Sequence, residues 1–360
     1  MVKYVLIYWI IAFILSLGSI AKGGQYFYHI GFLAMWAITA FRNVDLGGID
    51  AGFYQIFYGQ VPALENIIGW DSNYSWAYTL FNSTCKTFSH EYIFFQIIYS
   101  TVAFLLLYYI INKLELSNRQ KCIFLLTFFC FRFMWDMWII LRQNIADLIY
   151  WILTIYIYRA LNDKYKCFIL GILAVILPAG FHTSSWINII FLFVFYQLFK
   201  FEYIKKTYAV IIISLINFFV LSPSFADVLN MVSVIDTRYM MYANEDGSGN
   251  IAYFLARMLI VLLFFWRYNS FECKYKEYFY NMMLVMVLVG SFNVPIVVRM
   301  CDYYAIGMYG LLSCVHKLFE TKSGYFVNIL FSILLMMIFY WFLIRLDDGQ
   351  LMHYSLGINI

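Results

Sequence analysis

Long apolar runs separated by short polar gaps occupy most of the chain. The runs are about 13 to 21 residues long and continuously apolar, which is typical of membrane-spanning helices rather than half-buried strands. Because a backbone inside a bilayer must satisfy its own hydrogen bonds, we predict an all-α, polytopic integral membrane protein. About twelve transmembrane helices are expected, within a range of ten to fourteen, at about 4–20, 27–41, 92–111, 121–137, 141–158, 167–181, 183–199, 207–222, 251–267, 278–297, 303–318 and 325–345.

Two gaps are much longer than the others, at about 42–91 and 223–250. The second, fourth and sixth runs are short for a hydrocarbon core of about 30 Å, so tilts, kinks or partial spans are expected there. Pro178-Ala179-Gly180 is predicted to break a helix and to separate the sixth run from the seventh. No linker or internal repeat indicates a second domain, so residues 1–360 are expected to form a single transmembrane domain.

Basic residues concentrate in alternate gaps, and this asymmetry predicts the orientation. Six gaps of one parity hold fifteen of the 24 Lys and Arg residues: Lys22; Lys113, Arg119, Lys121; Arg159, Lys164, Lys166; Lys200, Lys205, Lys206; Arg267, Lys274, Lys276; Lys317, Lys322. The positive-inside rule makes that face cytoplasmic and places both termini and both long loops outside. Lys3 and Ser19-Ile20-Ala21 also resemble a cleaved signal, but Lys22 fits the alternation and favours an uncleaved first span.

The composition excludes several classes of protein. Hydrophobic residues make up 64% of the chain and charged residues 12%, against about a quarter charged in soluble domains. The inward gaps are too short for a nucleotide-binding domain, and no Walker A, dinucleotide-binding or HExxH motif occurs. The seven cysteines show no metal-binding spacing, so neither a metal nor another cofactor is expected. The net charge of +4 comes mostly from the inward gaps and does not indicate a nucleic-acid partner.

The outward face carries isolated arginines near the ends of the runs: Arg42, Arg132, Arg142, Arg238, Arg257 and Arg299. An arginine at membrane depth costs about 2.5–3.5 kcal/mol on insertion scales, so each needs a partner or a ligand. Asp136 and Asp302 are spaced to form helical ion pairs with Arg132 and Arg299. Arg42, Arg142 and Arg238 have no acid at that spacing on a predicted helix, and we expect them to bind a distant anion.

The guanidinium groups and a neighbouring aromatic loop together indicate a ligand. Guanidinium binds phosphate oxygens in a bidentate manner, so a lipid-linked phosphate or diphosphate is the expected anion. Residues 51–88 are rich in aromatic side chains that could stack on sugar rings: Phe53, Tyr54, Phe57, Tyr58, Trp70, Tyr74, Trp76, Tyr78 and Phe81. An aromatic belt at the membrane interface explains the same residues equally well.

Five motifs, in order along the chain, resemble those of the EpsG/Wzy-type polysaccharide polymerases. They are the run Arg42 to Asp50 with Tyr54 and Phe57; Arg142-Gln143-Asn144-Ile145-Ala146; Phe181-His182-Thr183-Ser184-Ser185; Thr237-Arg238-Tyr239 with Tyr242; and Arg299 with Tyr303 and Tyr304. Ile49 stands where that family usually has threonine, and Asn73-Tyr74-Ser75-Trp76 replaces an acidic element of the loop.

The resemblance implies a glycosyltransferase of the bacterial cytoplasmic membrane, with its active face outward. It would polymerise undecaprenyl-diphosphate-linked repeat units into O-antigen, capsule or exopolysaccharide, with one lipid-linked glycan as donor and another as acceptor. Arg142 and Arg299 would bind the diphosphate, and His182, or else Asp50, would be the general base. The remaining expected substrate-binding residues are Arg42, Asp45, Tyr54, Gln143, Ser184, Arg238 and Tyr239. Membrane lipid and a chain-length regulator protein are further expected partners.

Other functions remain open on the sequence alone. A flippase or transporter for lipid-linked or anionic solutes would also carry polar groups in its spans, but its charges should recur through both leaflets. An O-antigen ligase or an acyltransferase would show the same outward asymmetry and differ only in substrate. A purely structural scaffold would not account for the outward arginines.

The orientation can be tested by site-directed labelling. Single cysteines introduced near residues 60 and 240 should react with a membrane-impermeant maleimide in intact cells, because both positions fall in predicted outward loops. If labelling requires permeabilised cells, the predicted orientation is wrong and both loops face the cytoplasm.

Overall fold

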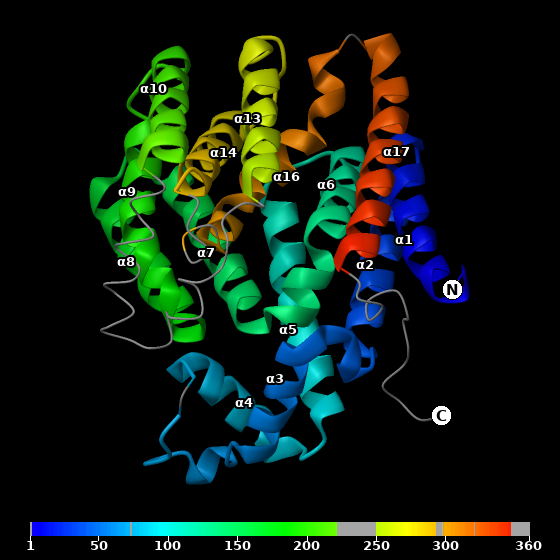
Figure 1. The fold of residues 1–360 in the computed structure, drawn as a ribbon, viewed down its shortest axis with the longest axis vertical. Helices are drawn as coiled ribbons and strands as arrows, with labels where there is room; N and C mark the ends of the chain where they lie inside the picture. The colour runs from blue at the N-terminus through cyan, green and yellow to red at the C-terminus, as the bar shows by residue number, and fades with distance from the viewer. Residues whose placement is uncertain are drawn as a thin grey trace. The chain divides into compact units, whose positions relative to one another are not determined.

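The computed structural model describes residues 2–72, 74–221, 250–292, 297, 299–319 and 321–346 (Figure 1). All regular elements in these ranges are helical. Four helices are long and apolar enough to cross a membrane: Tyr92–Lys113, Lys164–Phe181, Tyr203–Val220 and Gly324–Trp341. Shorter apolar helices accompany them. The protein is therefore all-helical and consistent with a multi-pass membrane protein, while the number of twelve spans stays a prediction.

Every predicted run coincides with a helix. The corresponding helices are α1 (Val2–Ile20), α2 (Gly24–Ala40), α5 (Tyr92–Lys113), α6 (Asn118–Phe131), α7 (Leu141–Arg159), α8 (Lys164–Phe181), α9 (Asn188–Leu198), α10 (Tyr203–Ile216), α13 (Asn250–Trp266), α14 (Lys276–Gly290), α16 (Ala305–Ser313) and α17 (Thr321–Leu346). In the fourth and eighth runs the α-helix gives way to a π-helical turn, at Trp135–Ile139 after α6 and at Asn217–Leu221 after α10. Kinks of this type shorten the regular helix.

The prediction of a helix break at Pro178-Ala179-Gly180 needs a correction. α8 continues through Pro178 and ends at Phe181, directly after this tripeptide, and a 3-10 helix at Thr183–Ile187 leads into α9. Proline has no N–H to donate to the carbonyl four residues earlier, and the helix ends within one turn after Pro178. The two runs are separated as predicted, but by the end of the helix and not at the proline itself.

The chain divides into two compact units. Unit 1 comprises Met1–Leu153, Ile176–Thr183 and Leu312–Ile360, and unit 2 comprises Thr154–Val175 and Ser184–Leu311. In unit 1, α1 packs on α2, α6 and α17. The buried rings of Tyr8 and Trp138 lie in this core. α6 begins with a capping box in which Ser117 and Gln120 satisfy each other's backbone amides.

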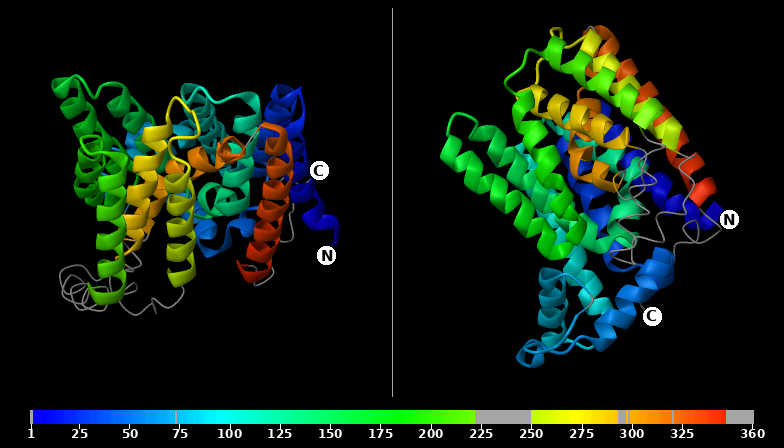
Figure 2. Two further views of the ribbon diagram at one scale, coloured as in Figure 1. Left: turned by 90° about the horizontal axis from the view of Figure 1, so that it is seen from above. Right: turned by 60° about the vertical axis from the view of Figure 1, so that its left-hand side comes forward.

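The long loop at about 42–91 is largely helical, which the sequence analysis did not predict. It contains α3 (Gly48–Gln60) and α4 (Trp76–Phe88), which lie beside the N-terminal end of α5 (Figures 1 and 2). The Lys86 ammonium, on α4, donates hydrogen bonds to the carbonyls of Tyr58 at 3.0 Å and Gly59 at 3.3 Å. A cation at these last carbonyls of α3 stabilises the end of that helix and ties the two helices together.

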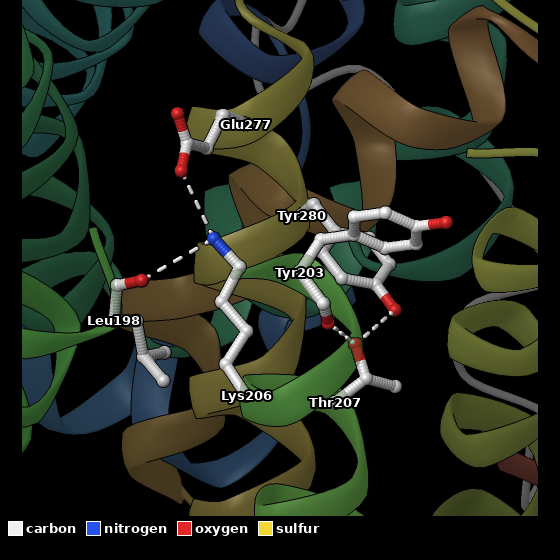
Figure 3. A network of polar contacts seen from close by, with 6 residues as sticks. All are labelled: Leu198, Tyr203, Lys206, Thr207, Glu277 and Tyr280. Carbon is white, nitrogen blue, oxygen red and sulfur yellow. Dashed lines mark hydrogen bonds and ion pairs between the residues drawn. The ribbon is translucent and has the colours of Figure 1, made fainter. Parts of the chain in front are cut away.

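In unit 2, one buried lysine joins three helices (Figure 3). Lys206, on α10, donates to the Leu198 carbonyl at the end of α9 at 3.3 Å and pairs with Glu277, in the first turn of α14, at 3.0 Å. The Lys206 side chain is 1% exposed and that of Glu277 is 41% exposed. The next residue, Thr207, bonds the Tyr280 hydroxyl at 2.8 Å. These contacts fix α10 against the start of α14.

Removing the Glu277 carboxylate should destabilise the protein more than removing that of Glu202. Breaking a buried pair costs about 3–5 kcal/mol, and the partial exposure of Glu277 should reduce this value. The Glu202–Lys205 pair is more than 70% exposed on both sides, and such pairs contribute about 0.2–1 kcal/mol. Thermal unfolding in detergent should give a lower melting temperature for Glu277→Gln than for Glu202→Gln.

Lys206→Met is a second informative variant, because it removes the charge and keeps much of the apolar stem. We expect it to be milder than Glu277→Gln, which leaves the buried ammonium without its carboxylate. Equal melting temperatures for Glu277→Gln and Glu202→Gln would show that the buried pair contributes no more to stability than the exposed pair.

Candidate functional site

Arg142 lies at the start of α7, where its side chain meets the aromatic cluster of the loop at about 42–91. Its guanidinium carbon is 4.4 Å from the centre of the Tyr74 ring and 5.9 Å from that of Tyr78. Tyr78 belongs to α4 and is fully buried, while Tyr74 precedes the helix and is half-buried. Cations are attracted to aromatic faces, and this attraction increases when water is excluded. The rings therefore fix the plane of the guanidinium group.

Arg142 has no carboxylate within ion-pairing distance in the described part of the chain. Its Nε is buried and lacks a hydrogen-bond partner among those same residues. Arg132 provides a contrast, since its Nε is 3.1 Å from Asp136, and the helical ion pair expected there is confirmed. Aromatic faces hold a guanidinium without using up its N–H donors, so Arg142 keeps donors for an anion.

Tyr54 and Asp50 complete the cluster around Arg142. Both lie on α3, four residues apart and hence on one helix face. Burial raises the pKa of Tyr54 to about 12, and the nearby charge and hydrogen bond of Arg142 oppose this rise while Asp50 adds to it. Tyr54 is thus a neutral phenol at neutral pH. The structure brings Asp50, Tyr54 and Arg142 together within unit 1.

The aromatic residues of the loop divide into two groups. Phe57 packs against Tyr74 at 4.3 Å and against Tyr78 at 5.7 Å between ring centres, so these rings form the core of the loop. Phe53 and Trp76 are 55% and 62% exposed. Only such exposed rings have a face available to a sugar or to the membrane interface.

His182 follows the end of α8, and that end packs on α4. A Cβ atom at Gly180 would lie 2.9 Å from the Trp76 ring and 3.0 Å from the Ala77 Cβ atom, so glycine is needed for this close approach. The amide of His182 donates to the Pro178 carbonyl at 2.9 Å, and its side chain is half-buried. His182 therefore lies near the first turn of the helix that carries Tyr78.

Arg42 is placed differently from Arg142. It is 1% exposed; its Nη2 donates to the Trp138 carbonyl at 3.2 Å, and its own carbonyl accepts from Gln96 at 2.9 Å. These bonds connect the end of α2 to the π-helical turn before α7. They favour a role for Arg42 in positioning the start of α7.

The remaining expected site residues fall in several places. Gln143 is buried on α7 in unit 1, and Asp45 belongs to the 3-10 helix Val44–Gly47, where its side chain is not described. Ser184 and Arg299 are half-buried residues of unit 2, and Arg299 directly precedes the 3-10 helix Met300–Tyr304. Arg238 and Tyr239, together with the rest of the loop at about 223–250 except for Asn250, lie outside the described residues.

The sequence analysis missed the way that Tyr74 and Tyr78 hold Arg142, because it treated both only as candidate sugar-stacking residues. No signal in the sequence pointed to this contact, because both tyrosines are remote from Arg142 along the chain. Within the described ranges, no group of three His, Cys, Asp or Glu side chains is arranged to hold a metal ion.

Comparison with known proteins identifies the family. No curated protein and no solved structure matches the chain. The sequence model of the EpsG family matches residues 25–356, a range that includes all five motifs, all of unit 2 and most of unit 1. This chain therefore belongs to the EpsG family, the family of Wzy-type polysaccharide polymerases.

Proposed function

We propose that this protein polymerises undecaprenyl-diphosphate-linked oligosaccharide units on the outer face of the bacterial cytoplasmic membrane. The product would be O-antigen, capsule or exopolysaccharide. Membership of the EpsG family supports polysaccharide polymerisation in general. The single observation that carries the proposed mechanism is an arginine that stacks on tyrosine and forms no ion pair with a described carboxylate.

The proposed reaction is a glycosyl transfer that needs no redox partner. The acceptor hydroxyl oxygen attacks the anomeric carbon of the donor glycan, and the bond from that carbon to the phosphate oxygen breaks. The lipid diphosphate leaves with the bonding electrons, and a base takes the hydroxyl proton. Negative charge thus develops on the leaving diphosphate, which is where preorganised cationic donors accelerate reaction most.

Arg142 is suited to bind that leaving group. Its guanidinium can donate two parallel hydrogen bonds to phosphate oxygens, and such bonds are stronger than those between neutral groups. Tyr74 and Tyr78 hold its plane in advance, so little rotational freedom remains to be lost on binding. Tyr54 supplies a neutral hydroxyl beside the same arginine. Arg299, in unit 2, stays a predicted substrate-binding residue on the family motif alone.

Two residues are candidates for the general base. His182 has an imidazole, whose ordinary pKa of about 6.5 suits proton transfer near neutral pH. Asp50 is exposed and lies close to Tyr54 and Arg142. A carboxylate beside a diphosphate site would repel the substrate, which favours His182.

Arg142→Gln and Arg299→Ala should each reduce polymerisation about 10²- to 10³-fold, the usual loss when one donor to a developing negative charge is removed. In a deletion strain carrying either variant, the ladder of surface glycan on a gel should collapse to a single repeat unit. Arg119→Gln is the matched control, because Arg119 also stacks on a tyrosine, at 4.6 Å, but lies on the predicted inward face.

Near-normal lengths of the surface glycan in both variants would contradict the proposed polymerase mechanism. If single repeat units still reach the surface in these variants, the protein is a polymerase and not a flippase. Loss of a flippase would leave no repeat units at the surface. An O-antigen ligase would instead leave polymer that is not transferred to its acceptor.

The base can be identified from the pH dependence of initial rates with purified protein and lipid-linked substrate. A general base must be unprotonated, so the rate should rise with pH through the pKa of the histidine. We expect His182→Ala to lower the rate about 10²- to 10⁴-fold and to abolish this rise. Asp50→Asn should keep the rise, and the opposite pattern would assign the base to Asp50.

A further inference from the structure

Arg257 lies on the buried stripe of an otherwise apolar helix. On α13, the side chains of Phe254, Val261 and Phe264 are fully buried, and Arg257 is spaced three and four residues from the first two. The opposite face carries exposed leucines, among them Leu259 at 66% exposure. Arg257 is half-buried and turned toward the protein interior of unit 2, not toward the surrounding lipid.

A glycine on the neighbouring helix provides space for the Arg257 guanidinium. A Cβ atom at Gly290, the last residue of α14, would lie 2.6 Å from Nη1 of Arg257 and 3.5 Å from the sulfur of Cys301. α13 and α14 are neighbours in Figure 1. Cys301 follows Arg299 by two residues, so the Gly290 position faces both Arg257 and the chain segment that begins with Arg299.

The described part of the chain offers Arg257 neither a hydrogen bond nor an ion pair. The end of α14 carries a partial negative charge of about half an elementary charge, which is the alternative partner for Arg257. However, the carbonyls of Val287, Leu288 and Val289 accept from the Ser291 amide, and none accepts from Arg257. Five N–H donors in an apolar helix bundle are thus left for a ligand.

We propose that Arg257 binds a phosphate group of a lipid-linked substrate, next to Arg299 in unit 2. The proposal rests on the proposed function, in which both donor and acceptor carry a prenyl diphosphate. A guanidinium is the group that matches such an anion, and its place between helices suits a ligand that enters from the bilayer. Arg257 belongs to none of the five family motifs described above and is a further substrate-binding residue.

The test is a binding titration of farnesyl diphosphate to the full-length protein in phosphatidylcholine nanodiscs. Arg257→Gln should weaken binding about tenfold or more, because a charge-assisted hydrogen bond is lost. Arg267→Gln is the matched control: this residue follows the other end of α13 and stacks on Trp266 at 4.5 Å. Wild-type affinity in Arg257→Gln would overturn the proposal.

Gly290→Ala gives a second variant that keeps the arginine. The added methyl group would overlap Nη1 and push the guanidinium away from the end of α14, so it should also weaken binding. Should Arg257→Gln not fold, as shown by its thermal unfolding, Gly290→Ala decides the outcome. Unchanged affinity in that variant would then overturn the proposal.

Two further measurements distinguish a failure of this inference from a failure of the proposed function. If phosphatidylglycerol in the nanodisc displaces farnesyl diphosphate from the wild type but not from Arg257→Gln, the anion is a phospholipid headgroup and the proposal is wrong. Gel analysis of Arg142→Gln tests the polymerase function separately. A collapsed ladder there, with normal diphosphate binding by Arg257→Gln, would reject this inference and leave the proposed function intact.

Discussion

The candidate site depends on one interaction, the stacking of the Arg142 guanidinium on the rings of Tyr74 and Tyr78. A carboxylate partner would neutralise this arginine and occupy its donors, as Asp136 does for Arg132. Aromatic faces instead lower the cost of placing the charge in an apolar setting and leave the N–H edge free. In the proposed function, this difference separates Arg132, which supports the fold, from Arg142, which binds the anion.

Several contacts of the local fold position the segments around Arg142. Lys86 fixes the end of α3 against α4, and Gly180 lets the end of α8 approach the first turn of α4. Arg42 connects the end of α2 to the turn that precedes α7. Each of these contacts lies in unit 1 and bears on a segment that carries a residue of the cluster. The loop at about 42–91 is therefore a folded subdomain rather than an irregular connection.

The apolar pattern predicted an all-helical protein correctly, because long continuous apolar runs favour helices that satisfy their own backbone hydrogen bonds, while the number of spans stays a prediction. It did not reveal α3 and α4, since their residues mix aromatic, small and polar types without a long apolar run. The motifs predicted Arg142, Tyr54 and Asp50 as site residues, and the structure adds that Tyr54 lies near both of the others. The pairing of Arg142 with Tyr74 and the position of Arg257 against Gly290 depend on tertiary contacts, which spacing along the chain does not encode.

The most direct test of this account is an experimental structure of the full-length protein with undecaprenyl diphosphate bound. The account predicts that a phosphate group lies within hydrogen-bond distance of the Arg142 guanidinium, with Tyr74 still stacked on its other side. A diphosphate bound elsewhere, with the Arg142 side chain turned to a carboxylate of the protein, would contradict it.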